Sequence, residues 1–258
     1  MQSSNDSNIK TCTTVAPSNQ AQLKDALYLT IPKPESVPPK PIEEPMQALE
    51  DLFKDLNLIW NQIEKLSKNN LISRKKKLEL VNLLTKKLDS MYVAIPIKIL
   101  SNHNVSLMRE ADMTWAHLSN LMQNPIIAEK EKNKQLTTLL RTLEFFYKNS
   151  SFTKTNDQNV DTLAEMLFLH LSNLSANNHI NHDKKKVLVS LIAQHLETLF
   201  QSCYSSKSNQ NLNGADTILN YLDKLRGDPL IPESKKKEMA NILVGGLESV
   251  YMHINKDT

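Results

Sequence analysis

The residues best suited to do chemistry in this sequence are lysines, which recur in four clusters along the chain. A cluster of ammonium groups can attract an acidic protein, an anionic lipid or a phosphate through its charge. The clusters are Lys75, Lys76 and Lys77; Lys130, Lys132 and Lys134; Lys184, Lys185 and Lys186; and Lys235, Lys236 and Lys237. We expect them to form a binding edge for an acidic partner protein. A solvated edge without a partner is the plainer alternative.

Histidine is the next candidate, and its spacing argues against a metal centre. His179, His182 and Asp183 lie together in sequence, with His170 and His195 on either side. Zinc sites need a fourth ligand at defined spacing, and the chain has no CxxC or HExxH motif. We therefore expect an ordinary polar turn here, and no metal.

Motifs that carry catalysis or hold a cofactor are also missing. The chain has four glycines, and none belongs to a GxGxxG, GxxxxGK[ST] or GxSxG motif. Cys203 has no basic residue or helix start beside it that would activate its thiol. The expectation is a protein that is not an enzyme and that uses no cofactor.

Composition narrows the class of partner and the compartment. Of 31 basic residues only four are arginine, so 27 lysines dominate a net charge of +3. Readers of nucleic acid usually rely on arginine, which makes a nucleic-acid partner less favoured than a protein. No run of eighteen apolar residues and no secretory signal is evident, and the two cysteines lie far apart. We expect a cytoplasmic or nucleocytoplasmic protein without a membrane span.

The elements that must position these lysines are four copies of one helical hairpin. Each copy contains a turn that begins with leucine, has Asn or Asp three residues later and isoleucine three residues after that. The turns are Leu66–Ser73, Leu121–Ala128, Leu174–Asn181 and Leu225–Pro232, so the leucines lie 55, 53 and 51 residues apart. Asn, Asp and Pro favour turns, and we expect each isoleucine to plug the tip of its hairpin.

The helix after each turn repeats as well. A leucine, an acidic residue and, three positions later, an aromatic residue recur as Leu88, Asp89 and Tyr92; Leu143, Glu144 and Tyr147; Leu196, Glu197 and Phe200; and Leu247, Glu248 and Tyr251. Before the turns, Trp60, Trp115, Phe168 and Leu219 match one another. Spacings of three and four place the leucines on one helical stripe, which predicts a packed core rather than a ligand pocket. We expect the aromatic residues to close the end of each hairpin.

The predicted fold is therefore all-α. It has four tandem hairpins stacked as a short array or as two bundles, because one hairpin cannot bury the stripes of both its helices. Residues 1–44 are polar and carry six of the eleven prolines, which predicts a disordered tail. Residues 45–152 would then hold hairpins 1 and 2, and residues 153–258 hairpins 3 and 4.

Part of the chain resembles a known helical domain. The match consists of packing residues between Ala48 and Met122: Leu56, Leu58, Leu71, Ile72, Leu80, Val81, Leu83, Leu84, Tyr92, Val93, Ala94, Asn102, His103, Trp115, Leu118, Leu121 and Met122. In these residues the segment resembles the domain shared by the steroid receptor RNA activator protein and the C-terminus of the COPII outer-coat scaffold subunit. Ser119 and Asn120 depart from a basic pair of that family, and Pro96 interrupts a stretch that should be helical.

The resemblance implies scaffolding or regulation in vesicle-coat or RNA-linked coregulator complexes. Together with the repeat, it predicts a non-enzymatic adaptor that binds another protein. Two alternatives stay open: a protein associated with RNA or another nucleic acid through the lysines, and a bacterial effector that binds a host protein. The oligomeric state is not indicated by the sequence.

Overall fold

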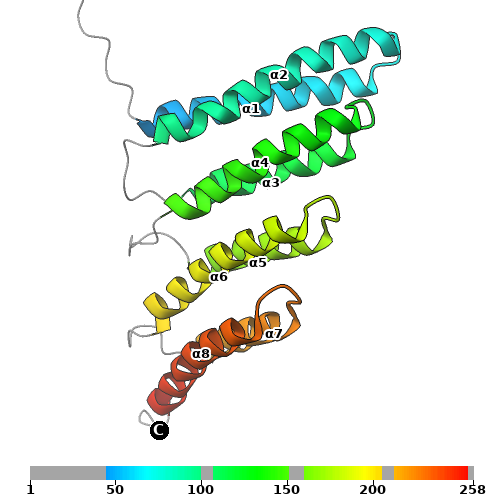
Figure 1. Cartoon of the computed structure of the whole chain (residues 1–258). Helices are drawn as coiled ribbons and strands as arrows, with labels where there is room; N and C mark the ends of the chain where they lie inside the picture. The colour runs from blue at the N-terminus through cyan, green and yellow to red at the C-terminus, as the bar shows by residue number, and fades with distance from the viewer. Residues whose placement is uncertain (1–44, 100–106, 151–159, 205–211, 255–258) are drawn as a thin grey trace, which may run out of the picture. The chain divides into compact units, whose positions relative to one another are not determined.

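The structure is a computed structural model that describes residues 45–99, 107–150, 160–204 and 212–254. Those residues form eight α-helices and no strand, which confirms the all-α prediction. The helices pair into four hairpins (Figure 1), with α1 Pro45–Lys68 and α2 Arg74–Ile99, α3 Met108–Gln123 and α4 Glu129–Asn149, α5 Val160–Ala176 and α6 His182–Tyr204, and α7 Leu212–Gly227 and α8 Glu233–Ile254. The predicted disordered tail, residues 1–44, lies outside the described residues.

The hairpin turns are held by the Asn and Asp side chains that the sequence singled out. Oδ1 of Asn69 accepts hydrogen bonds from the backbone N–H groups of Leu71 and Ile72, at 2.8 and 3.2 Å. The same oxygen of Asn124, Asn177 and Asp228 accepts from backbone N–H groups two or three residues on. Such local bonds fix a tight turn. Three of the four following isoleucines, Ile127, Ile180 and Ile231, are buried, as expected for residues that plug the tips, whereas Ile72 is only half-buried.

The hairpins stack in chain order as a single array, and the alternative of two bundles is not what the structure shows. Helices α2, α4, α6 and α8 pack one on the next, and α1, α3 and α5 do so less closely. The four hairpins belong to one compact unit, and the predicted division at residues 152 and 153 lies outside the described residues. The four turns lie at the same end of the hairpins (Figure 1).

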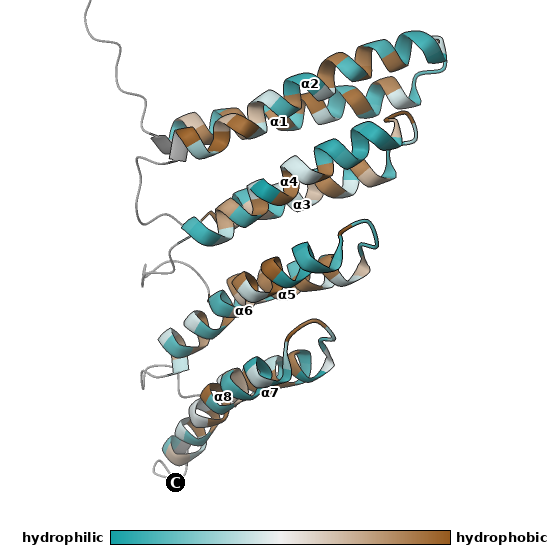
Figure 2. Ribbon diagram, in the orientation of Figure 1, coloured by the Kyte–Doolittle hydropathy of each residue, from teal (hydrophilic) through white to brown (hydrophobic). Residues whose placement is uncertain are grey.

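The apolar stripes meet in one continuous core. Figure 2 shows hydrophobic and hydrophilic residues alternating along each helix, as in an amphipathic helix that buries one face. The repeated leucines Leu88, Leu143 and Leu196 are fully buried, so the predicted face was assigned correctly. Among the described residues no helix is long and apolar enough to cross a membrane.

Two expectations about the helices were wrong. Helix α2 does not stop at Pro96 but continues to Ile99, because a proline so near the end of a helix displaces a single backbone hydrogen bond. The repeated aromatic residues do not simply close their own hairpins. Tyr92, Tyr147 and Phe200 are buried and contact the following hairpin, whereas Tyr251 in the last hairpin is exposed.

Candidate functional site

One lysine of each of the first three clusters serves the helix that precedes the turn. Its Nζ donates a hydrogen bond across the hairpin to a backbone carbonyl near the C-terminus of the first helix. The pairs are Lys77 with Ser67 at 3.1 Å, Lys132 with Met122 at 3.3 Å and Lys185 with Ser175 at 3.3 Å. Positive charge is unfavourable at a helix N-terminus but stabilises a helix C-terminus. The lysine recurs at the start of the second helix because its ammonium group stabilises the C-terminal end of the first helix.

Other lysines link one hairpin to the next. They contact the acidic residue that follows the repeated leucine on the preceding second helix. The ion pairs are Lys134 with Asp89 at 2.8 Å, Lys184 with Glu144 at 3.4 Å and Lys235 with Glu197 at 3.1 Å. Burial acts to raise the pKa of Asp89, but the hydrogen bonds from Lys134 and Thr138 together outweigh it, so the pKa is lowered. These contacts hold the second helices together along the stack.

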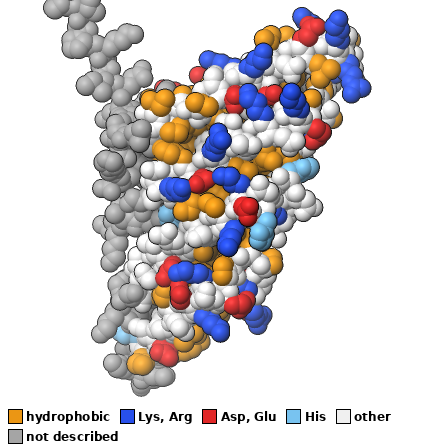
Figure 3. All heavy atoms as spheres, in the orientation of Figure 1, with side chains coloured by type: hydrophobic (Ala, Val, Ile, Leu, Met, Phe, Trp, Pro, Cys, Tyr) orange, Lys and Arg blue, Asp and Glu red, His pale blue; other side chains and the backbone are white. Residues whose placement is uncertain are grey.

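The remaining lysines of the clusters form ion pairs only within their own helix, or none among the described residues. Lys76 pairs with Glu79 and Lys236 with Glu233, both one turn away on the same helix. In the part of the chain that the structure describes, no ion pair involves Lys75, Lys130, Lys186 or Lys237, and all four are exposed. Figure 3 shows lysine and arginine side chains interspersed with acidic ones on the face it draws. Nearby carboxylates therefore neutralise much of the charge of these clusters, and the predicted binding edge stays a prediction.

The lysines of the last two clusters converge on one cavity. It has a volume of about 330 Å³ and lies between α6 and α8, lined by Lys185, Lys186, Lys235 and His182 together with apolar side chains. The apolar wall is formed by Val189, Ala193, Leu230 and Pro232. No acidic residue lines this cavity. It can therefore accept a negatively charged group that carries some apolar surface.

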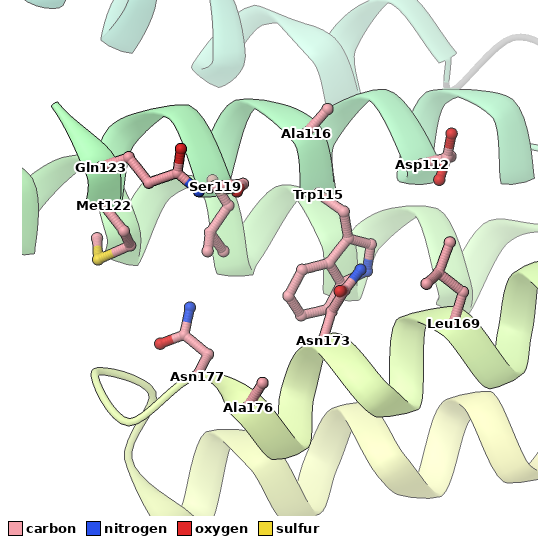
Figure 4. A pocket seen from close by; sticks show the side chains of 11 residues that line it. Asp112, Trp115, Ala116, Ser119, Met122, Gln123, Leu169, Asn173, Ala176 and Asn177 are labelled. Atoms are coloured by element: carbon pink, nitrogen blue, oxygen red, sulfur yellow. Dashed lines mark hydrogen bonds between the residues drawn. The ribbon is translucent and has the colours of Figure 1, made fainter.

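A second hollow runs between the first helices α3 and α5. Its volume is about 510 Å³, and side chains of both helices point into it (Figure 4). The floor is apolar, with Trp115 buried and Leu169 half exposed, and the walls carry the amides of Asn173 and Asn177. Asp112 is the one charged residue in the lining. This groove differs from the lysine cavity because it offers no cation.

The sequence analysis missed a chain of hydrogen bonds that joins hairpins 1 and 2. Trp60 Nε1 donates to Tyr92 Oη at 3.1 Å, and Tyr92 Oη lies 2.6 Å from Nδ1 of His117. Nε2 of His117 lies 2.6 Å from Oδ1 of Asn57. The order of donors assigns the imidazole proton to Nε2. Burial lowers the pKa of His117 to about 4, so the ring is neutral at neutral pH.

Hairpins 2 and 3 repeat this chain with one changed member. Trp115 Nε1 donates to Tyr147 Oη at 2.9 Å, and Tyr147 Oη lies 2.8 Å from Nδ1 of His170. The place of the asparagine is taken by Asp112, whose Oδ1 is 3.5 Å from Nε2 of His170. Because Nε2 of His170 makes no hydrogen bond among the described residues, this second chain of hydrogen bonds ends at Nδ1 of His170, and Asp112 lies beside the ring. The imidazole beside it lowers the pKa of Asp112. We call these two chains, with the asparagine or aspartate beside their histidines, the inter-hairpin relays.

The interface between hairpins 3 and 4 replaces the relay with stacked rings. Tyr221 occupies the position of the two histidines and contacts the rings of Phe168 and Phe200. Its hydroxyl donates to Asp161 at 2.9 Å. Gly246 also lets α8 approach closely, since a Cβ there would lie 2.8 Å from Cβ of Tyr204. The sequence did carry a signal for the relays. His117 and His170 lie 53 residues apart, which is also the interval between the turn leucines Leu121 and Leu174.

The histidines considered as metal ligands make different contacts in the structure. His170 belongs to a relay, and Nε2 of His195 lies 2.6 Å from the backbone oxygen of Tyr147. His182 lines the lysine cavity. Among the described residues, no group of three or more His, Cys, Asp or Glu is arranged to hold a metal ion. Comparison with protein-family models, curated proteins and solved structures found no significant match to this chain.

Proposed function

We propose that this chain is a non-enzymatic helical-repeat scaffold that binds an acidic segment of a partner protein in the lysine cavity between α6 and α8. The observation that carries the proposal is the convergence of Lys185, Lys186, Lys235 and His182 on one hollow with an apolar wall. A segment with a carboxylate beside an apolar residue matches both parts of that lining. The attraction between its carboxylate and the lysines is strongest where the cavity partly excludes water.

The three lysines have different parts in this proposal. Lys185 is already bound to a backbone carbonyl, and Lys235 to Glu197 and Glu238. Both still contribute charge at the cavity wall. Lys186 is exposed and forms no ion pair within the described chain, so its ammonium is the group that can turn to a ligand.

The class of complex is suggested by the sequence resemblance. If the helical domain is shared with coat and coregulator proteins, vesicle-coat or RNA-linked coregulator complexes are the first partners to test. A nucleic acid would use the same charge, but its recognition usually involves arginine forks or exposed aromatic platforms. The two Trp side chains are buried in the structure, so they offer no such platform.

The test is quantitative affinity capture with the full-length chain. Lys186→Glu reverses the free charge at the cavity, and Lys75→Glu reverses an exposed lysine in the first hairpin as the matched control. We expect Lys186→Glu to capture at least tenfold less partner than the parent chain at physiological salt, and Lys75→Glu to capture the same amount. Equal loss in both variants would show that the whole edge acts by charge alone, and full retention in Lys186→Glu would reject the cavity. RNA in place of protein among the captured material would also contradict the proposal.

A further inference from the structure

Hairpin 1 exposes an apolar surface on the side away from hairpin 2. We call it the leading face and define it by Leu58 and Gln62 of α1 and Leu80 and Leu83 of α2. Gln62, Leu80 and Leu83 line one groove of about 480 Å³. Leu58 and Leu83 are 56% and 64% exposed, and no described residue covers the groove.

The matching positions of the other hairpins are the ones that pack on a preceding hairpin. In hairpin 2 these residues are Met113, His117, Gln135 and Thr138, which lie 55 residues further on. Each contacts hairpin 1, through Asn57, Tyr92, the carbonyl of Thr85 and Asp89 respectively. Hairpin 1 therefore presents, with three leucines, a surface of the kind that its neighbours bury. A repeat that ends in water usually has a polar outer side.

Hairpin 4 exposes the opposite half of the same interface. We call it the trailing face and define it by Leu219 of α7 and Val244, Glu248 and Tyr251 of α8. Leu219, Val244 and Tyr251 are 44%, 41% and 44% exposed. The matching residues of hairpin 1, Trp60, Thr85 and Tyr92, are all less than 5% exposed because hairpin 2 covers them.

Charges on the two faces are complementary in the register of the array. Glu248 matches Glu144 and Glu197, which pair with Lys184 and Lys235 of the next hairpin. The residue of hairpin 1 at the position of those lysines is Lys76. Lys76 pairs with Glu79 on its own helix, as Lys235 pairs with Glu238. Lys235 also pairs with a glutamate of the preceding hairpin, and among the described residues Lys76 has no such second partner.

The polar tips are complementary too. Tyr251 matches Tyr92 and Tyr147, whose hydroxyls contact His117 and His170. Gln62 stands at the position of those histidines, and its side-chain amide can accept a hydrogen bond from a tyrosine hydroxyl. Around that contact, Leu219 and Val244 would cover Leu58, Leu80 and Leu83. Burial of apolar surface is the main driving force for such association.

We propose that the trailing face of one copy of this chain packs on the leading face of another, so that the stack of hairpins continues from copy to copy. The interface is the one used three times inside the chain. Because two different faces meet, the contact is head-to-tail and leaves a free face at each end. The protein then grows into linear oligomers as its concentration rises.

Sedimentation equilibrium of the full-length chain tests this proposal. Leu83→Asp blocks the leading face and Val244→Asp the trailing face, and both side chains are exposed, so folding should be kept. We expect the average mass of the parent chain to rise with concentration and each variant alone to stay a monomer. An equimolar mixture of the two variants should give a dimer and nothing larger, since each supplies the face that the other lacks.

Leu169→Asp is the control, because Leu169 is 53% exposed but lies on neither face; it should assemble like the parent. A parent chain that stays monomeric up to its solubility limit would overturn the proposal. So would a mixture of the two variants that forms no dimer. Circular dichroism of each variant verifies that it is folded.

Discussion

The two inter-hairpin relays use the same parts in different electrostatic settings. Between hairpins 1 and 2, His117 lies against the neutral amide of Asn57, at 2.6 Å. Between hairpins 2 and 3, His170 lies against the carboxylate of Asp112, at the longer distance of 3.5 Å. Both histidines are buried and both accept the hydroxyl of a buried tyrosine. The array therefore repeats the packing of the interface while it varies the charge beside the imidazole.

This difference separates two roles of a buried polar group. The shared hydrogen bonds orient the hairpins and satisfy polar atoms that would otherwise be costly to bury. Burial lowers the pKa of His117 in the first relay, so the interface between hairpins 1 and 2 should be sensitive to acid. The following changes test that division.

Removal of the tyrosine hydroxyls should have the largest effect. Tyr92→Phe and Tyr147→Phe each leave a buried tryptophan N–H and a histidine nitrogen without a partner, which costs about 1–3 kcal/mol of unfolding free energy. Tyr251→Phe, compared at concentrations where the chain is monomeric, is the matched control, because Tyr251 is then exposed and its loss should change stability by less than about 0.5 kcal/mol. Urea unfolding measures all three. A Tyr147→Phe effect as small as that of Tyr251→Phe would contradict the relay.

Acid should lower the unfolding free energy through the first relay, by slightly less than the removal of a tyrosine hydroxyl does. Because the pKa of His117 is lowered to about 4, the unfolded chain binds more protons than the folded one below about pH 6.5. Stability from this group is therefore lost as the pH falls. Between pH 7 and pH 5 the parent chain should lose about 2 kcal/mol more than His117→Gln, in which the other titrating groups are unchanged. Parallel pH profiles of the two proteins would refute this.

Exchange of the outer residue should convert one relay into the other. Asn57→Asp places a carboxylate beside His117 and should raise the pKa of that histidine by about one unit. The loss of stability between pH 7 and pH 4 then shrinks by about 1 kcal/mol. Urea unfolding at the two pH values measures the change, and Asp55→Asn, also exposed and on the same helix, is the control. An unchanged pH dependence in Asn57→Asp would show that the outer residue does not control the histidine.

The smallest effect is expected from the lysines at the helix ends. Lys132→Met removes the charge that bonds to the carbonyl of Met122 and should cost roughly 0.3–1 kcal/mol. Lys130→Met, two residues away and exposed, should leave stability unchanged. Thermal unfolding at low salt compares them. Equal midpoints for the two variants would remove the explanation offered for the repeated lysine.

Much of the fold could be predicted from the sequence because it depends on local patterns. The turn signature predicted Asn69 and its three counterparts correctly, since an Asx turn involves neighbours in the chain. The leucine stripe predicted the core through its helical spacing, as Leu196 shows. The interpretation of Pro96 as a break was wrong because its distance from the helix end was not known.

The relays could not be predicted in the same way. His117 and His170 are single polar residues on apolar stripes, and their partners lie up to 60 residues away on another hairpin. Their role depends on which hairpins stack and in which register. The lysines were found by their repetition, but what each one contacts was not evident. Lys132 looked like part of a surface and instead reaches a carbonyl across its own hairpin.

The most direct test of this account is the titration of the His117 side chain, followed by nuclear magnetic resonance of imidazole nitrogens in the full-length chain. The central claim is that this ring is enclosed between hairpins 1 and 2 and bonded at both nitrogens. The account predicts a neutral ring with its proton on Nε2 at pH 7 and a midpoint of about 4. A midpoint near 6.5, the value of a solvent-exposed histidine, would show that the hairpins do not pack around it.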